Sequence, residues 1–230
     1  GNILEPSCGV GSFFGCLPEA MSASRLYGVE LDGLTARIAR QLYPKAQITA
    51  AGFETTDRRD FYDLAVGNVP FGQYQVHDLA YNKLGFHIHN YFFAKALDQL
   101  RPGGILAFVT SRFTMDAKDP AVRKYLAQRA VLLGAIRLPN NAFKANAGTV
   151  VVSDIIFLQK ADKPILDEPE WVQTGQTKDG FPVNKYFLSH PEMVLGTLEA
   201  VSGPFGPQLD CRPIPGADLA RQLREAAQHI

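Results

Sequence analysis

The sequence predicts an α/β fold in which a mostly parallel sheet of about seven strands carries helices on both faces. Short apolar runs alternate with amphipathic stretches from residue 1 to about residue 160, a pattern typical of β-α-β units. A glycine-rich turn follows the first apolar run, as in open α/β sheets that bind ligands at the carboxyl ends of their strands. The expected strands cover residues 2–5, 26–31, 46–50, 62–67, 105–110, 132–138 and 150–158.

The composition supports a folded domain and excludes several other classes of protein. Of 230 residues, 46% are hydrophobic, and 23 basic side chains balance 23 acidic ones. This hydrophobic content excludes a disordered chain. No apolar run approaches the roughly 18 residues that a membrane span needs, so we expect a soluble protein with no membrane contact. With zero net charge, any surface that binds nucleic acid has to be local.

Helices are expected between the strands. Leu34, Ile38 and Leu42 recur every four residues, which is typical of an amphipathic helix. Residues 92–100 show the same period. The pair at 119–120, Asp followed by Pro, is typical of a helix N-terminus.

The end of the chain differs in character from the rest. Only the polar stretch 139–148 separates the last two expected strands, which predicts an antiparallel closing hairpin. After residue 160 the chain becomes rich in Pro and acidic residues. We therefore expect one domain over residues 1–160 and a C-terminal extension of irregular and helical structure over residues 161–230.

Cysteine and histidine give no evidence for a disulfide or a metal. Cys8, Cys16 and Cys211 lack a Cys-x-x-Cys spacing, so we expect a reducing, cytoplasmic setting. His87 and His89 could bind zinc only with a third ligand, and their place just before a helix favours capping or loop ordering. Since the chain has no initiator Met and no signal peptide, we expect a piece of a longer protein.

A glycine loop follows the first expected strand, in the sequence Leu-Glu-Pro-Ser-Cys-Gly-Val-Gly-Ser-Phe over residues 4–13. Gly9 and Gly11 allow a ligand to approach the backbone closely. A dinucleotide-binding loop would have a third Gly where Phe14 stands, and a tight turn without a ligand is the alternative. Glu30 ends the second strand at the place from which a carboxylate binds ribose hydroxyls, unless it is only a solvated acid. Together these residues favour adenosine binding.

Asn68, Val69, Pro70 and Phe71 follow the fourth strand at the same edge of the sheet. An amine on an aromatic ring is a weak nucleophile because its lone pair is delocalised into the ring. The side-chain oxygen of Asn68 and the carbonyl of Val69 can accept its two N–H groups and localise that lone pair. Pro70 stiffens the turn, and a planar base can stack on Phe71, which is worth about 1–3 kcal/mol.

These motifs together resemble the N6-adenine DNA methyltransferases that use S-adenosylmethionine. The resemblance covers about residues 1–160 and includes a later loop that ends in Phe143. It is closest to the modification subunits of type I restriction systems. The chain also resembles methylase modules fused to helicase-like proteins of bacterial mobile elements, through an Asn-x-Tyr-Phe motif at residues 184–187 and residues 190–196.

The resemblance implies a Rossmann-like class I methyltransferase sheet with its last strand antiparallel. It implies that a flipped adenine meets Asn68 and stacks on Phe71, with Phe143 on its other side, because the amine is inaccessible inside a duplex. It places Glu5 and the two loop glycines around the methionine end of the cofactor and Glu30 on its ribose. The cofactor-binding residues expected are Glu5, Pro6, Ser7, Gly9, Gly11, Glu30 and Phe53.

Three departures from the family pattern stand out. Val69 replaces the first Pro of the usual Asn-Pro-Pro-Phe, but this position contributes a carbonyl, so we expect the chemistry to survive. The family has an Asp after the third strand that receives the amine of the cofactor adenine, whereas residues 51–54 read Ala-Gly-Phe-Glu. Phe53 could pack on the adenine, and Glu54 could replace the acid or face water. The helix and motif that usually precede the first strand are absent.

The expected function is S-adenosylmethionine-dependent methylation of adenine N6 in DNA, with residues 68–71 catalytic and no metal. One alternative is a methyltransferase that acts on RNA or protein glutamine. Another is an inactive DNA-binding or scaffold module. The expected partners are DNA and either further domains of the parent protein or separate specificity or helicase subunits. We expect the protein in the cytoplasm, encoded by a bacterium or a mobile element.

Two charged features have no assigned role. Residues 101–144 hold eight basic side chains and two acidic ones, which predicts either a phosphate-facing patch or an ordinary solvated face. Asp154 lies within an apolar strand, where a buried carboxylate would need a partner.

Overall fold

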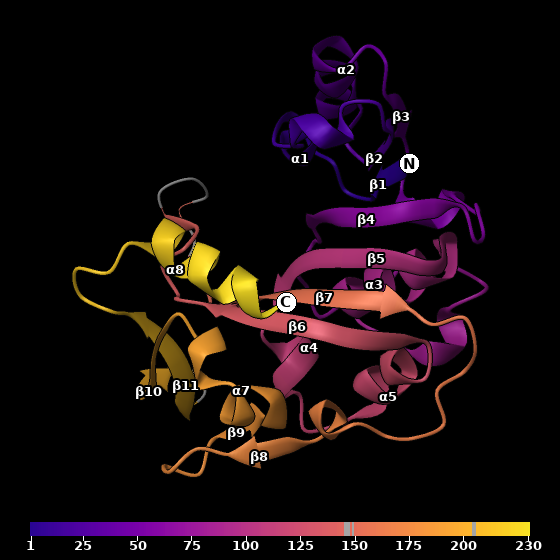
Figure 1. Ribbon diagram of the computed structural model, residues 1–230. Helices are drawn as coiled ribbons and strands as arrows, with labels where there is room; N and C mark the ends of the chain where they lie inside the picture. Colours follow the sequence, from indigo (N-terminus) through magenta and orange to yellow (C-terminus); the bar gives the residue numbers. More distant parts are fainter. Residues whose placement is uncertain (145–147, 149, 204–205) are drawn as a thin grey trace. The chain divides into compact units, whose positions relative to one another are not determined.

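The computed structural model describes residues 1–144, 148, 150–203 and 206–230 (Figure 1). No helix in this described part is both long enough and apolar enough to cross a membrane. The chain divides into two compact units, and the domain boundary expected near residue 160 stays a prediction. The first unit comprises Gly1–Val109, Arg129–Val131 and Leu158–Pro164, and the second comprises Thr110–Gln128, Leu132–Phe157 and Ile165–Ile230.

Seven strands form the main sheet in the order β3-β2-β1-β4-β5-β7-β6. The strands β1 to β5 pair in parallel, and the last strands are antiparallel. Because β1 lies between β2 and β4, the loops that follow these three strands meet at one edge of the sheet. The bounds are β1 (Asn2–Glu5), β2 (Arg25–Glu30), β3 (Gln47–Ala50), β4 (Tyr62–Asn68), β5 (Leu100–Ser111), β6 (Ala130–Leu138) and β7 (Ser153–Lys160).

Two of the helices, α2 and α5, begin beside an Asp whose side chain accepts a backbone N–H of the first turn. Asp32 precedes α2, and its Oδ2 accepts the backbone N–H of Thr35 at 2.7 Å. Asp119 accepts the N–H of Ala121, the first residue of α5, at 2.9 Å. These bonds satisfy helix N–H groups that have no partner within the helix. The α-helices are α1 (Ser12–Gly15), α2 (Gly33–Leu42), α3 (Ile88–Gln99), α4 (Phe113–Asp116), α5 (Ala121–Ala127), α7 (Lys185–Ser189) and α8 (Leu219–Ala226).

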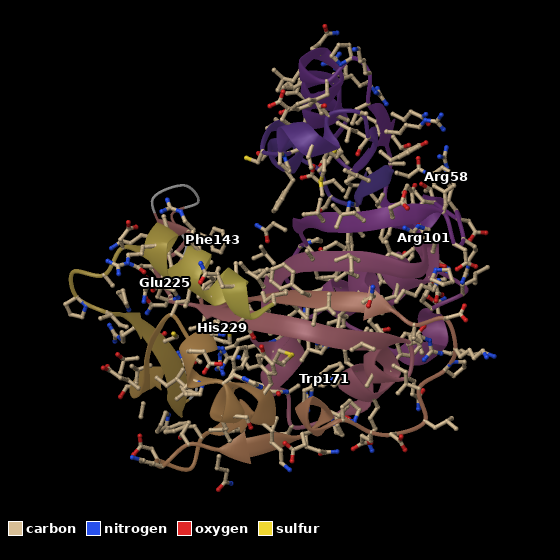
Figure 2. All side chains as sticks on the ribbon, in the orientation of Figure 1. Arg58, Arg101, Phe143, Trp171, Glu225 and His229 are labelled. Carbon is tan, nitrogen blue, oxygen red and sulfur yellow. The ribbon has the colours of Figure 1, made fainter. Side chains whose placement is uncertain are left out.

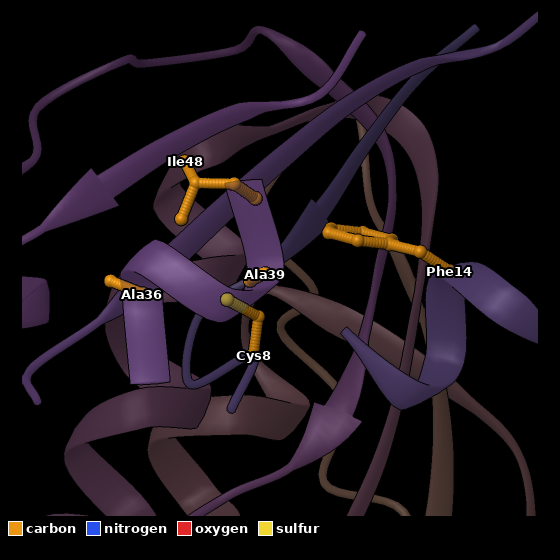
Figure 3. Packing of buried hydrophobic residues seen from close by; sticks show 5 residues of the cluster. All are labelled: Cys8, Phe14, Ala36, Ala39 and Ile48. Carbon is orange, nitrogen blue, oxygen red and sulfur yellow. The ribbon is translucent and has the colours of Figure 1, made fainter. Parts of the chain in front are cut away.

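The apolar stripe of α2 faces outward. Leu34, Ile38 and Leu42 are 59%, 42% and 58% exposed, whereas Ala36 and Ala39 are fully buried. The expectation of a helix here is confirmed, but the four-residue period does not mark the buried face, because the small alanines allow closer packing. The buried cluster on that side consists of Cys8, Phe14, Ala36, Ala39 and Ile48 (Figure 3).

The residues after 160 contain strands that the sequence does not predict. Two antiparallel pairs form there, β8 (Thr174–Gln176) with β9 (Pro182–Asn184) and β10 (Gly196–Gly203) with β11 (Gly206–Pro213). Trp171, labelled in Figure 2, is buried, and its carbonyl accepts the Nδ2–H of Asn184 at 2.8 Å.

A buried charge cluster belongs to the second unit and gives Asp154 its partner. Arg137 is fully buried and donates from Nε and Nη2 to the two carboxylate oxygens of Asp154 at 2.8 and 2.9 Å. Its Nη1 lies 2.8 Å from Oδ2 of Asp116. Burial alone would lower the pKa of Arg137, but the two carboxylates raise it. The guanidinium therefore stays charged and compensates both acids.

Candidate functional site

A pocket of about 800 Å³ lies in the first unit, lined by the loops that follow β1, β2, β3 and β4 and by residues of α3. Its volume is within the range of small-molecule and cofactor sites. Nine of the twelve residues predicted for the site line it, and they come from four separate segments of sequence. These are Pro6, Ser7, Gly9, Glu30, Phe53, Asn68, Val69, Pro70 and Phe71.

Backbone geometry holds the glycine loop against Glu30. Gly9 and Gly11 have φ angles of 54° and 87°, a backbone conformation that residues other than Gly rarely adopt. The N–H of Gly9 donates to Oε2 of Glu30 at 2.8 Å, and the N–H of Asp32 donates to Oε1 at 2.8 Å. Gly11 does not line the pocket, and a Cβ there would lie 2.6 Å from the ring of Tyr43. Gly11 therefore shapes the loop.

Glu5 is a buried acid at the end of β1, outside the pocket lining. Glu5 is only 2% exposed. Burial and, to a smaller extent, the charge of Glu30 raise its pKa to about 8, although hydrogen bonds from the backbone N–H groups of Phe13 and Phe14 oppose this rise. In the described part of the chain its Oε2 has no hydrogen-bond partner. A carboxyl group in this state would be stabilised in its charged form by a nearby cation.

The loop after β4 has a fixed backbone and an available carboxamide. The hydroxyl of Ser7 donates to the carbonyl of Asn68 at 2.9 Å, and the N–H of Val69 donates to the carbonyl of Val109 at 3.1 Å. The side chain of Asn68 is exposed and makes no hydrogen bond with any described residue. Phe71 is 37% exposed. This loop can thus present an amide oxygen and a ring face to a ligand.

An aromatic wall follows β3. Phe53 begins a short 3-10 helix, Phe53–Thr55, and its ring packs on Phe92 of α3 with centroids 5.0 Å apart. The carboxylate of Glu54 lies against Gly52, in the space that a side chain on residue 52 would fill. An acid is therefore present at this end of the pocket although residue 52 has no side chain.

The sequence did not reveal one side of the pocket. Residues 74–77, with Ile88 and Phe92, complete the lining. The only signal in that polar stretch is Tyr74, an aromatic residue that is 56% exposed. His89 interacts with the backbone of Gly72, and burial lowers the pKa of His89 to about 4. A neutral His89 that bonds to the backbone of Gly72 agrees with a role in ordering this loop.

Other candidates lie outside the pocket. Phe143, labelled in Figure 2, belongs to the second unit, and its contact with a base stays a prediction. Arg123 and Arg137 are buried, so two of the eight basic residues of the 101–144 stretch cannot face phosphate. Burial raises the pKa of the Cys8 thiol to about 12, which agrees with a packing role.

No protein-family model matches the chain, but curated proteins are similar to it. Defense against restriction protein B of Escherichia phage P1 is 31% identical over 167 residues, which are 70% of this chain and 7% of that protein. Type II methyltransferase M.CvrRI of Paramecium bursaria Chlorella virus XZ-6E is 40% identical over 70 residues, 30% of this chain and 18% of that protein. A type II methyltransferase of Thermus thermophilus is 30% identical over 147 residues, 56% of this chain and 33% of that protein. The chain thus spans a third or less of each relative.

Solved structures decide the fold. A candidate class I S-adenosylmethionine-dependent methyltransferase from Listeria monocytogenes superposes with a TM-score of 0.58 at 23% identity, over 72% of this chain and 56% of that one. The fold is that of a class I methyltransferase. The modification subunit of a candidate type I restriction enzyme from Vibrio vulnificus YJ016 shares this methyltransferase fold, with a TM-score of 0.57 at 16% identity, over 92% of this chain and 54% of that one. The predicted fold class and the resemblance to restriction-modification methyltransferases are confirmed.

Proposed function

We propose that this chain is the catalytic domain of a DNA methyltransferase that transfers a methyl group from S-adenosylmethionine to the N6 of a flipped adenine. One observation carries the proposal: the glycine loop, Glu30 and the Asn68–Phe71 loop line a single pocket. The names of the curated relatives, type II methyltransferases among them, support DNA as the class of substrate.

The pocket offers a place for each part of the cofactor. Glu30 already accepts two backbone N–H groups, and its remaining lone pairs can accept the ribose hydroxyls. Glu5 would face the cationic methionine end, where a positive charge would favour its ionised form. Phe53 would pack on the adenine, and Glu54 would accept the adenine amine in place of the Asp that the family usually has. When bound, S-adenosylmethionine would supply a methyl group on a sulfonium sulfur, and the neutral thioether S-adenosylhomocysteine would be the leaving group.

The chemistry of the protein is alignment and polarisation. The carboxamide oxygen of Asn68 and the carbonyl oxygen of Val69 accept the two N–H groups of the target amine and localise its lone pair. Phe71 holds the base plane by stacking. The N–H of Val69 bonds to Val109, a bond that Pro at this position could not make. Valine therefore fixes the loop by a hydrogen bond where other members use a ring.

Flipping the adenine gives the pocket access to its amine, and further parts of the protein would choose the target. The chain spans at most 33% of its curated relatives, and we propose that specificity or motor domains of the parent protein, or partner subunits, read the DNA in the cytoplasm. The eight basic residues of the 101–144 stretch do not form the DNA surface as a set, because Arg123 and Arg137 are buried.

The deciding experiment follows a labelled methyl group. The chain, alone and within its parent protein, is incubated with labelled S-adenosylmethionine and DNA, and nucleosides are analysed. We expect the label on the N6 of adenine. Label on cytosine, on RNA or on protein glutamine would reject adenine as the acceptor, and absence of cofactor binding would favour the inactive scaffold.

Asn68→Ala sharpens this test. Loss of one of the two acceptors should reduce transfer by about 10²–10³-fold, the usual effect of removing one preorganised hydrogen-bonding group. Affinity for S-adenosylhomocysteine, measured by calorimetry, should stay within about twofold of wild type. Gln41→Ala is the matched control, because it removes an exposed carboxamide of α2 outside the pocket and should change neither quantity.

A further inference from the structure

We propose that Lys95 is a positioning residue that joins two walls of the pocket and thereby sets the affinity for the purine end of the cofactor. This inference rests on the proposed function. The first wall consists of residues 51–54, which follow β3, and the second wall consists of residues 74–77. The nearest ends of the two walls, residues 54 and 74, are 20 positions apart in sequence, and the buried ammonium group of Lys95 on α3 connects them.

The ammonium group of Lys95 makes one contact with each side. Its Nζ donates to the carbonyl of Glu54, the last residue of the first wall, at 3.1 Å. It also donates to Oδ2 of Asp78, the residue directly after the second wall, at 2.7 Å. The side chains of Lys95 and Asp78 are only 5% and 10% exposed. Since water has little access, each bond constrains the backbone more strongly than a surface contact would.

Asp78 is itself held in its charged form. The hydroxyl of Tyr91 donates to the same Oδ2 at 2.8 Å. Burial alone would raise the pKa of Asp78, but the hydrogen bonds from Lys95 and Tyr91 lower it below its ordinary value. Asp78 thus remains an anionic partner for the ammonium group, and the second wall is anchored to α3 by two side chains.

The ammonium group also lies over the ring of Phe53, which we propose packs on the adenine of the cofactor. Its Nζ lies 5.6 Å from the ring centroid of Phe53 and 5.9 Å from that of Tyr91, within the range of cation–π attraction. Phe53 therefore lines the pocket and touches Lys95 at the same time. Removal of the charge would release the ring, the backbone of Glu54 and the second wall together.

The bonds of Lys95 lead to pocket walls, and this distinguishes it from Lys160 in the same unit. Lys160 also makes a side-chain bond to an acid, Asp60, at 2.6 Å, and a bond to a backbone carbonyl, that of Leu100, at 2.6 Å. None of these residues lines the pocket. Lys160→Met is therefore a matched control for the loss of a partly buried ammonium group.

The test compares Lys95→Met and Lys160→Met in the 230-residue chain by titration with S-adenosylhomocysteine. We expect Lys95→Met to weaken binding at least tenfold, while methyl transfer at saturating cofactor stays within about threefold of wild type. Lys160→Met should bind within about twofold of wild type. Equal weakening in the two variants, or wild-type binding by a folded Lys95→Met chain, would overturn the inference.

Two further measurements keep the result decisive. Tyr91→Phe removes one hydrogen bond to Asp78 and keeps the ring, so it should weaken binding by about threefold; if Lys95→Met does not fold, unchanged binding by Tyr91→Phe overturns the inference. Wild-type chain that does not bind S-adenosylhomocysteine would instead refute the proposed cofactor. A loss of transfer without a loss of affinity would refute the assignment to the purine end.

Discussion

The two units each bury a carboxylate, and they compensate it differently. In the second unit Asp154 is fully buried and receives two bonds from the guanidinium of Arg137. In the first unit Glu5 is 2% exposed and has no basic side chain bound to it in the described part of the chain, and burial raises its pKa to about 8. Because an uncompensated buried charge is costly, the acid with its own partner reads as structural. Glu5, which has no such partner and lies at a strand end next to residues that line the pocket, is the acid that a cationic ligand could compensate.

Arg137→Met should have the largest effect, because it removes the partner of two buried acids. We expect it to lower the free energy of unfolding by about 3–5 kcal/mol, measured by urea denaturation followed by circular dichroism. Arg221→Met is the control, because Arg221 makes an exposed ion pair with Glu225, and the unfolding midpoint of this variant should not move. If Arg137→Met unfolds at the wild-type midpoint, the cluster contributes no net stability and the contrast with Glu5 fails.

Glu5→Gln should act in the opposite direction, and its effect should depend on pH. The pKa of Glu5 is about 8 in the folded chain and 4.5 in the ordinary state. Between these values the unfolded chain holds fewer protons, so the stability of the wild type falls as pH rises and levels off above pH 8. Glutamine does not ionise, so Glu5→Gln avoids this loss of stability. Its free energy of unfolding should exceed that of the wild type by up to about 4 kcal/mol at pH 8 and by almost nothing at pH 4.5. Thermal unfolding across this pH range measures the difference.

The same variant tests whether Glu5 serves a ligand. If a cation of the cofactor ionises Glu5, wild-type affinity for S-adenosylhomocysteine should rise with pH up to about pH 8, and in Glu5→Gln this rise should disappear. A variant that is more stable and binds more weakly would confirm the contrast with Asp154. Unchanged affinity would show that Glu5 only holds the glycine loop, through its hydrogen bonds with the backbone of Phe13 and Phe14.

Ser7→Ala should have the smallest effect of the series. It removes the bond from the Ser7 hydroxyl to the carbonyl of Asn68, which joins the glycine loop to the Asn68–Phe71 loop near the surface. We expect a loss of about 1 kcal/mol or less in unfolding free energy and a few-fold slower transfer at unchanged cofactor affinity. Ser22→Ala, at an exposed position outside the pocket, should alter neither quantity. Equal transfer rates in both variants would show that the Ser7 bond does not position Asn68.

The sequence predicts those parts of the site in which a short motif ends a strand. The glycine loop follows β1, while Glu30 and Asn68 are the last residues of β2 and β4, and a parallel sheet brings such strand ends together. Phe53 was predicted from its place after the third strand and does line the pocket. The roles of these residues stay proposals.

The rest depends on pairings that leave no local pattern. Lys95 bonds to a residue 17 positions away and to another 41 positions away, so no sequence window contains the link. Arg137 appears in the sequence as one of several basic residues, and only its burial shows that it belongs to the interior. The apolar stripe on α2 has the period of a helix but lies on the exposed face, and the buried face is formed by the small Ala36 and Ala39.

Trp171 gives the chain a built-in optical reporter. It is the single tryptophan of the sequence, and it is buried in the second unit. Trp171 is not among the residues that line the pocket of the first unit. Any change in indole emission during a cofactor titration would therefore reveal communication between the units, without a label or a substitution.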